Sequence, residues 1–191
     1  MSLFGIAGLV IALDQWTKWL VHEHIEFGAQ WLPAWLVWLM PYARIVHWYN
    51  SGAAFGMFQN GNLIFTILAI IVIAAIIYYY PHVETNDWTL KLAMGLQLGG
   101  AAGNLIDRLI KGKVTDFISI GTFPVFNVAD SSITIGVIVL LLGVWWKEWQ
   151  EKKKADGGQL TKDGDTSAAL SASQPPAHST EQANATEQKN D

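Results

Sequence analysis

The sequence contains no cysteine among its 191 residues. This absence excludes disulfides, thiolate nucleophiles and cysteine-based metal sites. Histidine is scarce, with five residues, and the two histidines of His22-Glu23-His24 are too close together for a His-Glu-x-x-His zinc motif. The net charge of −4 supplies no basic surface of the kind that binds nucleic acid. The composition therefore points to no metal centre and to no nucleic-acid partner.

Charged residues are also few, at 15% of the chain against 51% hydrophobic residues, and they are unevenly distributed. Residues 1–150 hold nearly all the apolar side chains, whereas residues 151–191 are rich in Lys, Gly, Ser, Ala, Gln and Asp. A polar segment without periodicity cannot bury enough apolar surface to offset the chain entropy lost on ordering. We predict a membrane domain over residues 1–150 and a disordered polar tail over residues 151–191.

Four apolar runs, at residues 3–21, 63–80, 92–106 and 125–146, are candidates for membrane-spanning helices. About 20 residues cross a hydrocarbon core. The first run competes with a cleaved signal peptide, but it lacks the basic leader of such a peptide, so a retained helix is favoured. The pattern predicts an all-α membrane protein with four transmembrane helices and both termini on one side.

The connection over residues 22–60 is rich in aromatic residues. Trp31, Trp35 and Trp38 have helical spacing and suit a short helix in the plane of the membrane interface. Residues 44–49 are rich in strand formers and are followed by a turn signal at residues 50–52. We predict a small surface structure with two or three short strands beside a short interfacial helix.

The orientation of the spans is almost balanced by charge. Lys147 and residues 152–154 favour a cytoplasmic C-terminus, because cytoplasmic flanks are enriched in Lys and Arg. Arg108, Lys111 and Lys113 lie in the third connection, on the opposite side, and argue against that choice. Charge alone leaves the orientation open.

Two carboxylates near the ends of the third and fourth runs form the candidate catalytic pair. Asp116 follows the third run in an alternating stretch, and Asp130 stands at the start of the fourth. Adjacent helix ends on one membrane face bring the two carboxyls within reach of each other. Two carboxyls about 3 Å apart share one proton. The ionised member can then take a proton from water while the protonated member polarises a peptide carbonyl.

Each of these residues also has an ordinary structural interpretation. Asp130 would be favourable at a helix N-terminus without further role, although Asn127 is already a good N-cap candidate. Asp116 is equally well explained as a solvated loop residue. Asp107 and Arg108 would suit an interfacial pair that ends a helix.

Polar and small residues within the spans predict contacts between helices. Asp14 and Lys18 are four residues apart, so an ion pair would reduce the cost of placing them in a membrane. Glycines at every fourth position of the third run allow a second helix to approach closely. Those glycines are Gly95, Gly99 and Gly103, and a neighbouring row on the same helix holds Gly100, Asn104 and Arg108.

Five motifs in order resemble those of the lipoprotein signal peptidases, also called signal peptidase II, a family of bacterial membrane aspartyl proteases. The motifs are Asp14-Gln15-x-Thr17-Lys18, Asn50-x-Gly52-Ala53-Ala54-Phe55-Gly56, Gly99-Gly100-Ala101-x-Gly103-Asn104-x-x-Asp107-Arg108, Val114-x-Asp116-Phe117 and Phe126-Asn127-x-Ala129-Asp130-Ser131. Each motif alone is weak evidence, but five in the same order are highly specific.

The resemblance implies that Asp116 and Asp130 are the catalytic dyad and that no cofactor or metal takes part. It implies a second set of residues that bind substrate or support the site: Asp14, Lys18, Asn50, Gly52, Gly100, Asn104, Asp107, Arg108, Asn127 and Ala129. Among these, Asn50 and Arg108 would contact the substrate or an inhibitor of the globomycin type.

The resemblance also implies the reaction and its location. The substrate would be a prolipoprotein whose cysteine carries diacylglycerol, cut just before that cysteine to release the signal peptide. The protein would lie in the bacterial cytoplasmic (inner) membrane, in contact with membrane lipids, with both termini cytoplasmic and the site near the periplasmic face. The first connection would form an extracytoplasmic β-cradle and a short interfacial helix.

A small proton-coupled transporter or a helix-bundle scaffold is the competing interpretation, because carboxylates within membranes also mark proton pathways. It predicts that Asp14, deepest in a span, matters most and that Asp116 matters little.

Overall fold

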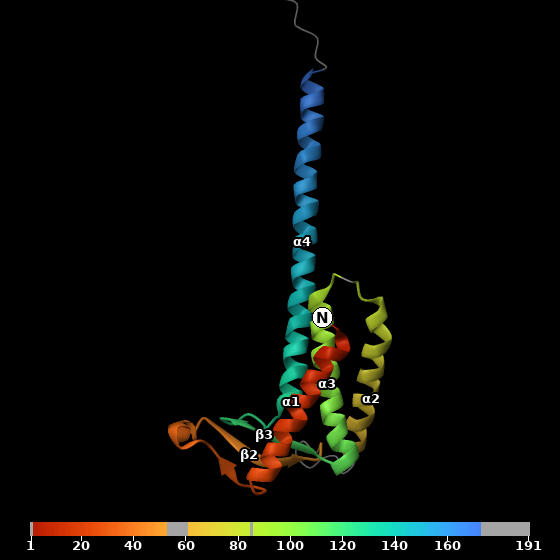
Figure 1. Ribbon diagram of the computed structural model, residues 1–191. Coiled ribbons are helices and arrows are strands. Elements are labelled where there is room, and N and C mark those ends of the chain that lie inside the picture. Colours follow the sequence, from red (N-terminus) through yellow and green to blue (C-terminus); the bar gives the residue numbers. More distant parts are fainter. Residues whose placement is uncertain (1, 53–60, 85, 173–191) are drawn as a thin grey trace, which may run out of the picture. The chain divides into compact units, whose positions relative to one another are not determined.

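The computed structural model describes residues 2–52, 61–84 and 86–172, with side chains as far as residue 153. Within them it has four α-helices (Figure 1), α1 (Leu3–His24), α2 (Gly61–Tyr79), α3 (Trp88–Lys111) and α4 (Val128–Ala172), and two 3-10 helices, η1 (Ala34–Leu39) and η3 (Tyr80–His82). The chain divides into two compact units, Met1–Trp146 and Lys147–Asp191. The first unit contains every element except the later part of α4. Residues 53–56 of the second sequence motif lie outside the described residues.

Each of the four predicted apolar runs coincides with a helix. Two segments, Gly61–His82 and Val128–Lys153, are long and apolar enough to cross a membrane by length and composition. Most of their large apolar side chains are exposed, which suits contact with lipid. Helices α1 and α3 are less apolar than these two segments, because both carry charged and polar residues. The structure thus has two candidate spans among the described residues, and the four-span count stays a prediction.

Helix α4 continues to Ala172, whereas we predicted an irregular chain from residue 151. Residues 151–172 hold four lysines and four alanines, which are good helix formers, beside three glycines, which are not, and no proline follows the start of α4 until Pro175. The disorder that we predicted for residues 151–191 stays a prediction, although the backbone is helical as far as Ala172. Residues 173–191 lie outside the described residues, so a disordered tail there stays a prediction.

Helices α1 and α3 pack through the predicted row of glycines. A Cβ atom built on Gly95 would lie 2.8 Å from the Cβ of Ile6, and one built on Gly99 would lie 2.6 Å from the Cβ of Val10. Real Cβ atoms do not approach so closely, so glycine is needed at both positions. The close approach lets polar side chains of α1 reach α3 directly.

A three-stranded antiparallel sheet covers one end of the helices (Figure 1). Its order is β1 (Gln30–Trp31), β2 (Ala43–Asn50) and β3 (Val114–Ile120), which confirms the predicted small sheet. The prediction of a helix through the tryptophans is correct for Trp35 and Trp38 in η1, but Trp31 lies in β1. Trp48 of β2 pairs with Asp116 of β3, so both side chains face the same side of the sheet.

We expect Gly99→Ala to destabilise the protein, because the new methyl group would meet both the Val10 side chain and the Ala7 carbonyl oxygen, 2.9 Å away. Overpacking of this kind costs about 1–3 kcal/mol. Gly8→Ala on α1 is the matched control, since nothing lies within 4 Å of its Cβ position. Thermal unfolding in detergent should show a lower midpoint for the first variant alone, and equal midpoints would contradict this packing.

Candidate active site

A reciprocal cap at the start of α4 positions Asp130. The Asp130 backbone N–H donates to Asn127 Oδ1 over 2.9 Å, and the Asn127 backbone N–H donates to Asp130 Oδ2 over 3.2 Å. This is the capping-box arrangement with Asn and Asp in its two positions. It confirms Asn127 as the N-cap and leaves the second carboxylate oxygen of Asp130 available to other partners.

Strand β3 positions the other carboxylate. Asp116 is only 2% exposed, so it is not the solvated loop residue of the alternative interpretation. Its Oδ1 accepts from Asn127 Nδ2 over 2.7 Å, and its Oδ2 accepts from Asn50 Nδ2 over 3.0 Å. Asn127 therefore contacts both aspartates, through its side chain on Asp116 and its backbone on Asp130.

The turn after β2 orients Asn50. The Gly52 backbone N–H donates to Asn50 Oδ1 over 2.8 Å, which leaves the Asn50 amide nitrogen to face Asp116. Gly52 has φ +80°, a conformation that favours glycine, and a Cβ there would lie 2.6 Å from the Phe65 ring. Glycine at this position therefore serves both the turn and the close contact with α2.

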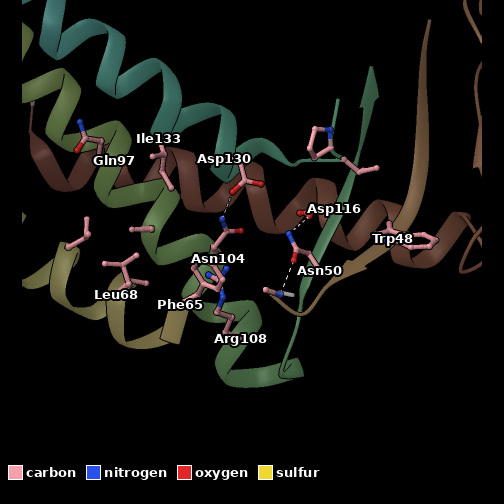
Figure 2. A pocket seen from close by; sticks show the side chains of 16 residues that line it. Trp48, Asn50, Phe65, Leu68, Gln97, Asn104, Arg108, Asp116, Asp130 and Ile133 are labelled. Carbon is pink, nitrogen blue, oxygen red and sulfur yellow. Dashed lines mark hydrogen bonds between the residues drawn. The ribbon is translucent and has the colours of Figure 1, made fainter. Parts of the chain in front are cut away.

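Asp116 and Asp130 line one cavity of about 720 Å³. Figure 2 shows the two carboxylates on its wall, with Asn104 bonded to Asp130 and Asn50 bonded to Asp116. Arg108 brings a positive charge to the cavity, with its guanidinium carbon 5.5 Å from the centre of the Phe65 ring. The opposite wall is apolar and comes from α2. The cavity thus combines two carboxylates with a surface suited to an apolar ligand.

Burial and, second to it, the nearby charge of Asp130 raise the pKa of Asp116 to about 6. Hydrogen bonds from Asn50 and Asn127 act in the opposite direction, because they stabilise the ionised form. Asp116 therefore keeps a proton to a higher pH than an ordinary carboxyl. This is the behaviour expected of the proton-bearing member of a carboxylate pair.

A buried cation supports the site from behind. Lys18 has no exposed surface, and its Nζ lies 2.8 Å from Asp14 Oδ2 and 3.2 Å from Asp107 Oδ2. The predicted pair of Asp14 and Lys18 is confirmed. Asp107 is fully buried and also lies 3.3 Å from Lys111, so its ionic partners are these lysines. An interfacial pair with Arg108 is not what the structure shows.

Asn104 connects this cation to Asp130 and Asn127. Its Oδ1 accepts from Lys18 Nζ over 3.0 Å and from Asn127 Nδ2 over 3.2 Å. The amide is therefore oriented with its nitrogen toward Asp130, and Nδ2 donates to Asp130 Oδ1 over 2.7 Å. Asn104 is thus part of the site as well as a contact between helices.

Asp14 and Gly100 hold the first turn of α4 from two sides. Asp14 Oδ1 accepts from the Ala129 backbone N–H over 2.9 Å. A Cβ on Gly100 would collide with the Ala129 carbonyl oxygen and with Ser132. Ala129 itself is fully buried, so its small side chain fits beneath the turn.

The structure separates the predicted residues into two sets. Those that line the cavity are Asn50, Gly52, Asn104, Arg108, Asp116 and Asp130. Those behind it are Asp14, Lys18, Gly100, Asp107, Asn127 and Ala129. Among the described residues, no group of three or more His, Asp or Glu side chains could hold a metal ion.

Several lining residues were missed by the sequence analysis. Gln97 and Ala101 precede Asn104 and Arg108 on the same face of α3, and this spacing could have identified them. Trp48 could have been found by its alternation with Asn50 along β2. Phe65, Leu68, Ala69 and Val72 of α2 gave no signal, because that helix is apolar on every face.

The comparisons with known proteins agree with this geometry. The family model described as signal peptidase (SPase) II matches residues 6–146. The chain belongs to the signal peptidase II family. It is 38% identical over 167 residues to the lipoprotein signal peptidase of Anoxybacillus flavithermus, covering 85% of this chain and 96% of that relative. It is 42% identical over 149 residues to the lipoprotein signal peptidase of Shouchella clausii, covering 78% and 95%.

Two solved structures are similar to this chain in fold. The fold is similar to that of a bacterial membrane enzyme with a TM-score of 0.68 and 31% sequence identity, over 76% of this chain and 88% of that one. A second bacterial membrane enzyme gives a TM-score of 0.67 at 32% identity, over 74% and 91%. This signal peptidase II family member is therefore a peptidase and a membrane protein.

We expect Lys18→Met to destabilise the peptidase strongly, because Asp14 and Asp107 would lose their buried cation. Breaking a buried ion pair costs about 3–5 kcal/mol. Lys111→Met is the matched control, since Lys111 contacts the same Asp107 but its side chain is 31% exposed. Unfolding midpoints in detergent should fall much further for Lys18→Met, and equal decreases would contradict the role of Lys18.

Proposed function

We propose that this protein removes signal peptides from diacylglyceryl-modified prolipoproteins, cutting just before the lipidated cysteine, as an aspartic endopeptidase. The observation that carries the proposal is the placement of Asp116 and Asp130 on one cavity wall, with Asn127 bonded to both. The membership of the signal peptidase II family supports the substrate class.

In the proposed mechanism the pair holds one proton, and Asp116 carries it. Asp130 is ionised and accepts hydrogen bonds from Asn104 and from the Asn127 backbone. Asp130 takes a proton from a water molecule as the water oxygen attacks the scissile carbonyl carbon. Asp116 donates its proton to the carbonyl oxygen.

The shape of the cavity supports an apolar substrate segment. The α2 wall, formed by Phe65, Leu68, Ala69 and Val72, would contact the apolar signal peptide and the lipid on the cysteine. Asn50 and Arg108 would contact the polar backbone near the scissile bond. An inhibitor of the globomycin type would occupy the same cavity.

The proposed placement is in the cytoplasmic (inner) membrane with four spans. Helices α1 and α3 end beside the sheet, and α2 and α4 begin there, so the site lies at one end of the bundle (Figure 1). With the site at this end of the bundle, a periplasmic active site places the start of α1 on the cytoplasmic side.

The transporter interpretation finds less support. Asp14 does not line the cavity but is bonded to Lys18 and Ala129, as a structural residue would be. No observation within the described residues favours a proton pathway through it.

We expect Asp116→Asn and Asp130→Asn each to lower cleavage of a lipidated precursor at least about a hundred-fold, the range of general acid–base catalysis. Asn has the size of Asp but turns one amide nitrogen toward an N–H donor at either position, so the unfolding midpoint and membrane insertion of both variants are measured beside cleavage. Glu23→Gln, an exposed carboxyl at the same end of the bundle, is the control and should leave cleavage unchanged. Normal cleavage by either aspartate variant would exclude the dyad.

A pH profile tests which member carries the proton. The protonated form of Asp116, with its pKa raised to about 6, is lost as the pH rises, so kcat/KM should fall on the alkaline side. Asn50→Ala removes a hydrogen bond to the ionised form and should raise this pKa further. The alkaline limb of the variant should therefore move to higher pH. A limb that stays in place or moves to lower pH would contradict the assignment.

A further inference from the structure

Gln97 is a polar side chain of the cavity that the proposed mechanism does not use. It belongs to α3 and lines the cavity together with Asn104 and Arg108 of the same helix. The residue is half-buried, and its side-chain amide makes no hydrogen bond within the described part of the chain. A glutamine amide carries two N–H donors and one carbonyl acceptor. The amide is therefore free to bind a ligand in the cavity.

Gln97 lies well away from the carboxylates. It precedes Asn104 by two helical turns, which correspond to about 10 Å along the axis of α3. Figure 2 shows Gln97 and Asp116 toward opposite sides of the cavity, with Asp130 between them. The other polar side chains of the lining gather at the carboxylate end, and they are Asn50, Asn104, Arg108, Asp116 and Asp130.

The end of the cavity that contains Gln97 is otherwise apolar. Helices α2 and α4 begin near the sheet, so the later lining residues of each helix lie farther from it (Figure 1). On α2 these later residues are Leu68, Ala69 and Val72, and on α4 the residue is Ile133. Gln97 thus places an amide among side chains that suit the acyl chains of a lipid.

Packing against α4 holds the stem of Gln97 in place. A Cβ atom built on Gly136 would lie 2.9 Å from Gln97 Cγ and 2.9 Å from the Ala93 carbonyl oxygen. Glycine at this buried position therefore allows α4 to contact the stem directly. The amide group beyond Cγ is the part of the side chain that can turn toward a ligand.

The proposed substrate carries hydrogen-bond acceptors at the matching distance. About eight covalent bonds, through Cβ and the sulfur of the cysteine, join the scissile carbonyl carbon to the nearer ester carbonyl of a diacylglyceryl group, and such a chain extends over about 10 Å. The carbonyls of the signal peptide are the other acceptors within reach. A helical segment in a membrane pairs its own carbonyls internally, whereas the ester carbonyls have no donor of their own. The ester groups are therefore the better partners for the amide.

We propose that Gln97 is a specificity residue, whose Nε2 donates a hydrogen bond to an ester carbonyl of the diacylglyceryl group on the substrate. The inference rests on the proposed function and adds to it a polar contact that distinguishes one lipid linkage from another. The acyl chains would then lie along the apolar end of the cavity, beside Val72 and Ile133. A precursor with a lipid of the same size but without ester carbonyls should accordingly be a poorer substrate.

Two synthetic precursors test this contact with the full-length protein in phospholipid vesicles. One carries diacylglyceryl on its cysteine, and the other carries dialkylglyceryl, whose ether linkages lack the carbonyl oxygens. We expect the wild-type KM to be about three- to ten-fold lower for the diacyl precursor, the range of one hydrogen bond, with kcat unchanged. Gln97→Met keeps the length of the side chain but removes the amide. It should raise KM for the diacyl precursor to the dialkyl value and leave the dialkyl KM unchanged.

Leu109→Met is the matched control, because Leu109 is an exposed residue of α3 outside the cavity. It should leave KM for both precursors unchanged, and unfolding midpoints in detergent report whether either variant loses stability. An equal rise in KM for both precursors in Gln97→Met would overturn the proposal, since the amide would then contact the peptide or serve only in packing. Equal wild-type KM values for the two precursors would overturn it as well.

An infrared measurement reports the same contact without cleavage. A hydrogen bond weakens the ester C=O bond, so the band of an isotopically labelled ester carbonyl should lie at lower wavenumber in precursor bound to Asp130→Asn than in precursor bound to Asp130→Asn combined with Gln97→Met. The same band position in both complexes would overturn the proposal. A wild-type protein that cleaved neither precursor would contradict the proposed function instead, and the infrared band would still decide the role of Gln97.

Discussion

Lys18 is a cation without exposed surface, and the architecture of the site depends on how that charge is balanced. Two carboxylates on two helices, Asp14 and Asp107, neutralise it. Each also holds a backbone N–H of the site region, at Ala129 and at Thr115. The interaction therefore determines where the first turn of α4 and the start of β3 lie. Those two segments carry the two carboxylates of the cavity, Asp130 and Asp116.

The second constraint is the set of hydrogen bonds that Asn127 makes to three different elements. Asn127 caps α4, bonds Asp116 and contacts Asn104, so the helix start, the strand and the third helix meet at one residue. Lys18 donates to Asn104 Oδ1 and so orients its amide, and Asn104 Nδ2 then donates to Asp130. Each donor and acceptor among these side chains has a partner. A side-chain amide that rotated by 180° would therefore break at least two hydrogen bonds.

Local sequence patterns predicted those contacts of the site that join residues close together in the chain. The cap at Asn127 and the pair of Asp14 with Lys18 lie within one helical turn, and both are confirmed. The contacts of Lys18 with Asp107 and Asn104 join distant parts of the chain, so no sequence pattern indicated them. The α2 wall could not be predicted for a different reason: α2 is apolar on every face, so its sequence does not indicate which side lines the cavity. Disorder from residue 151 was predicted from polarity, whereas the backbone of α4 is helical as far as Ala172.

The two walls of the cavity differ in how freely they can change. On the polar wall, substitution at Asn50, Asn104 or Asp116 disturbs bonds that also hold the fold together. Leu68, Ala69 and Val72 on the α2 wall are apolar side chains outside the hydrogen-bond network that holds the carboxylates. Substitutions along α2 can therefore change the shape of the apolar wall of the cavity without altering the hydrogen bonds of the two carboxylates.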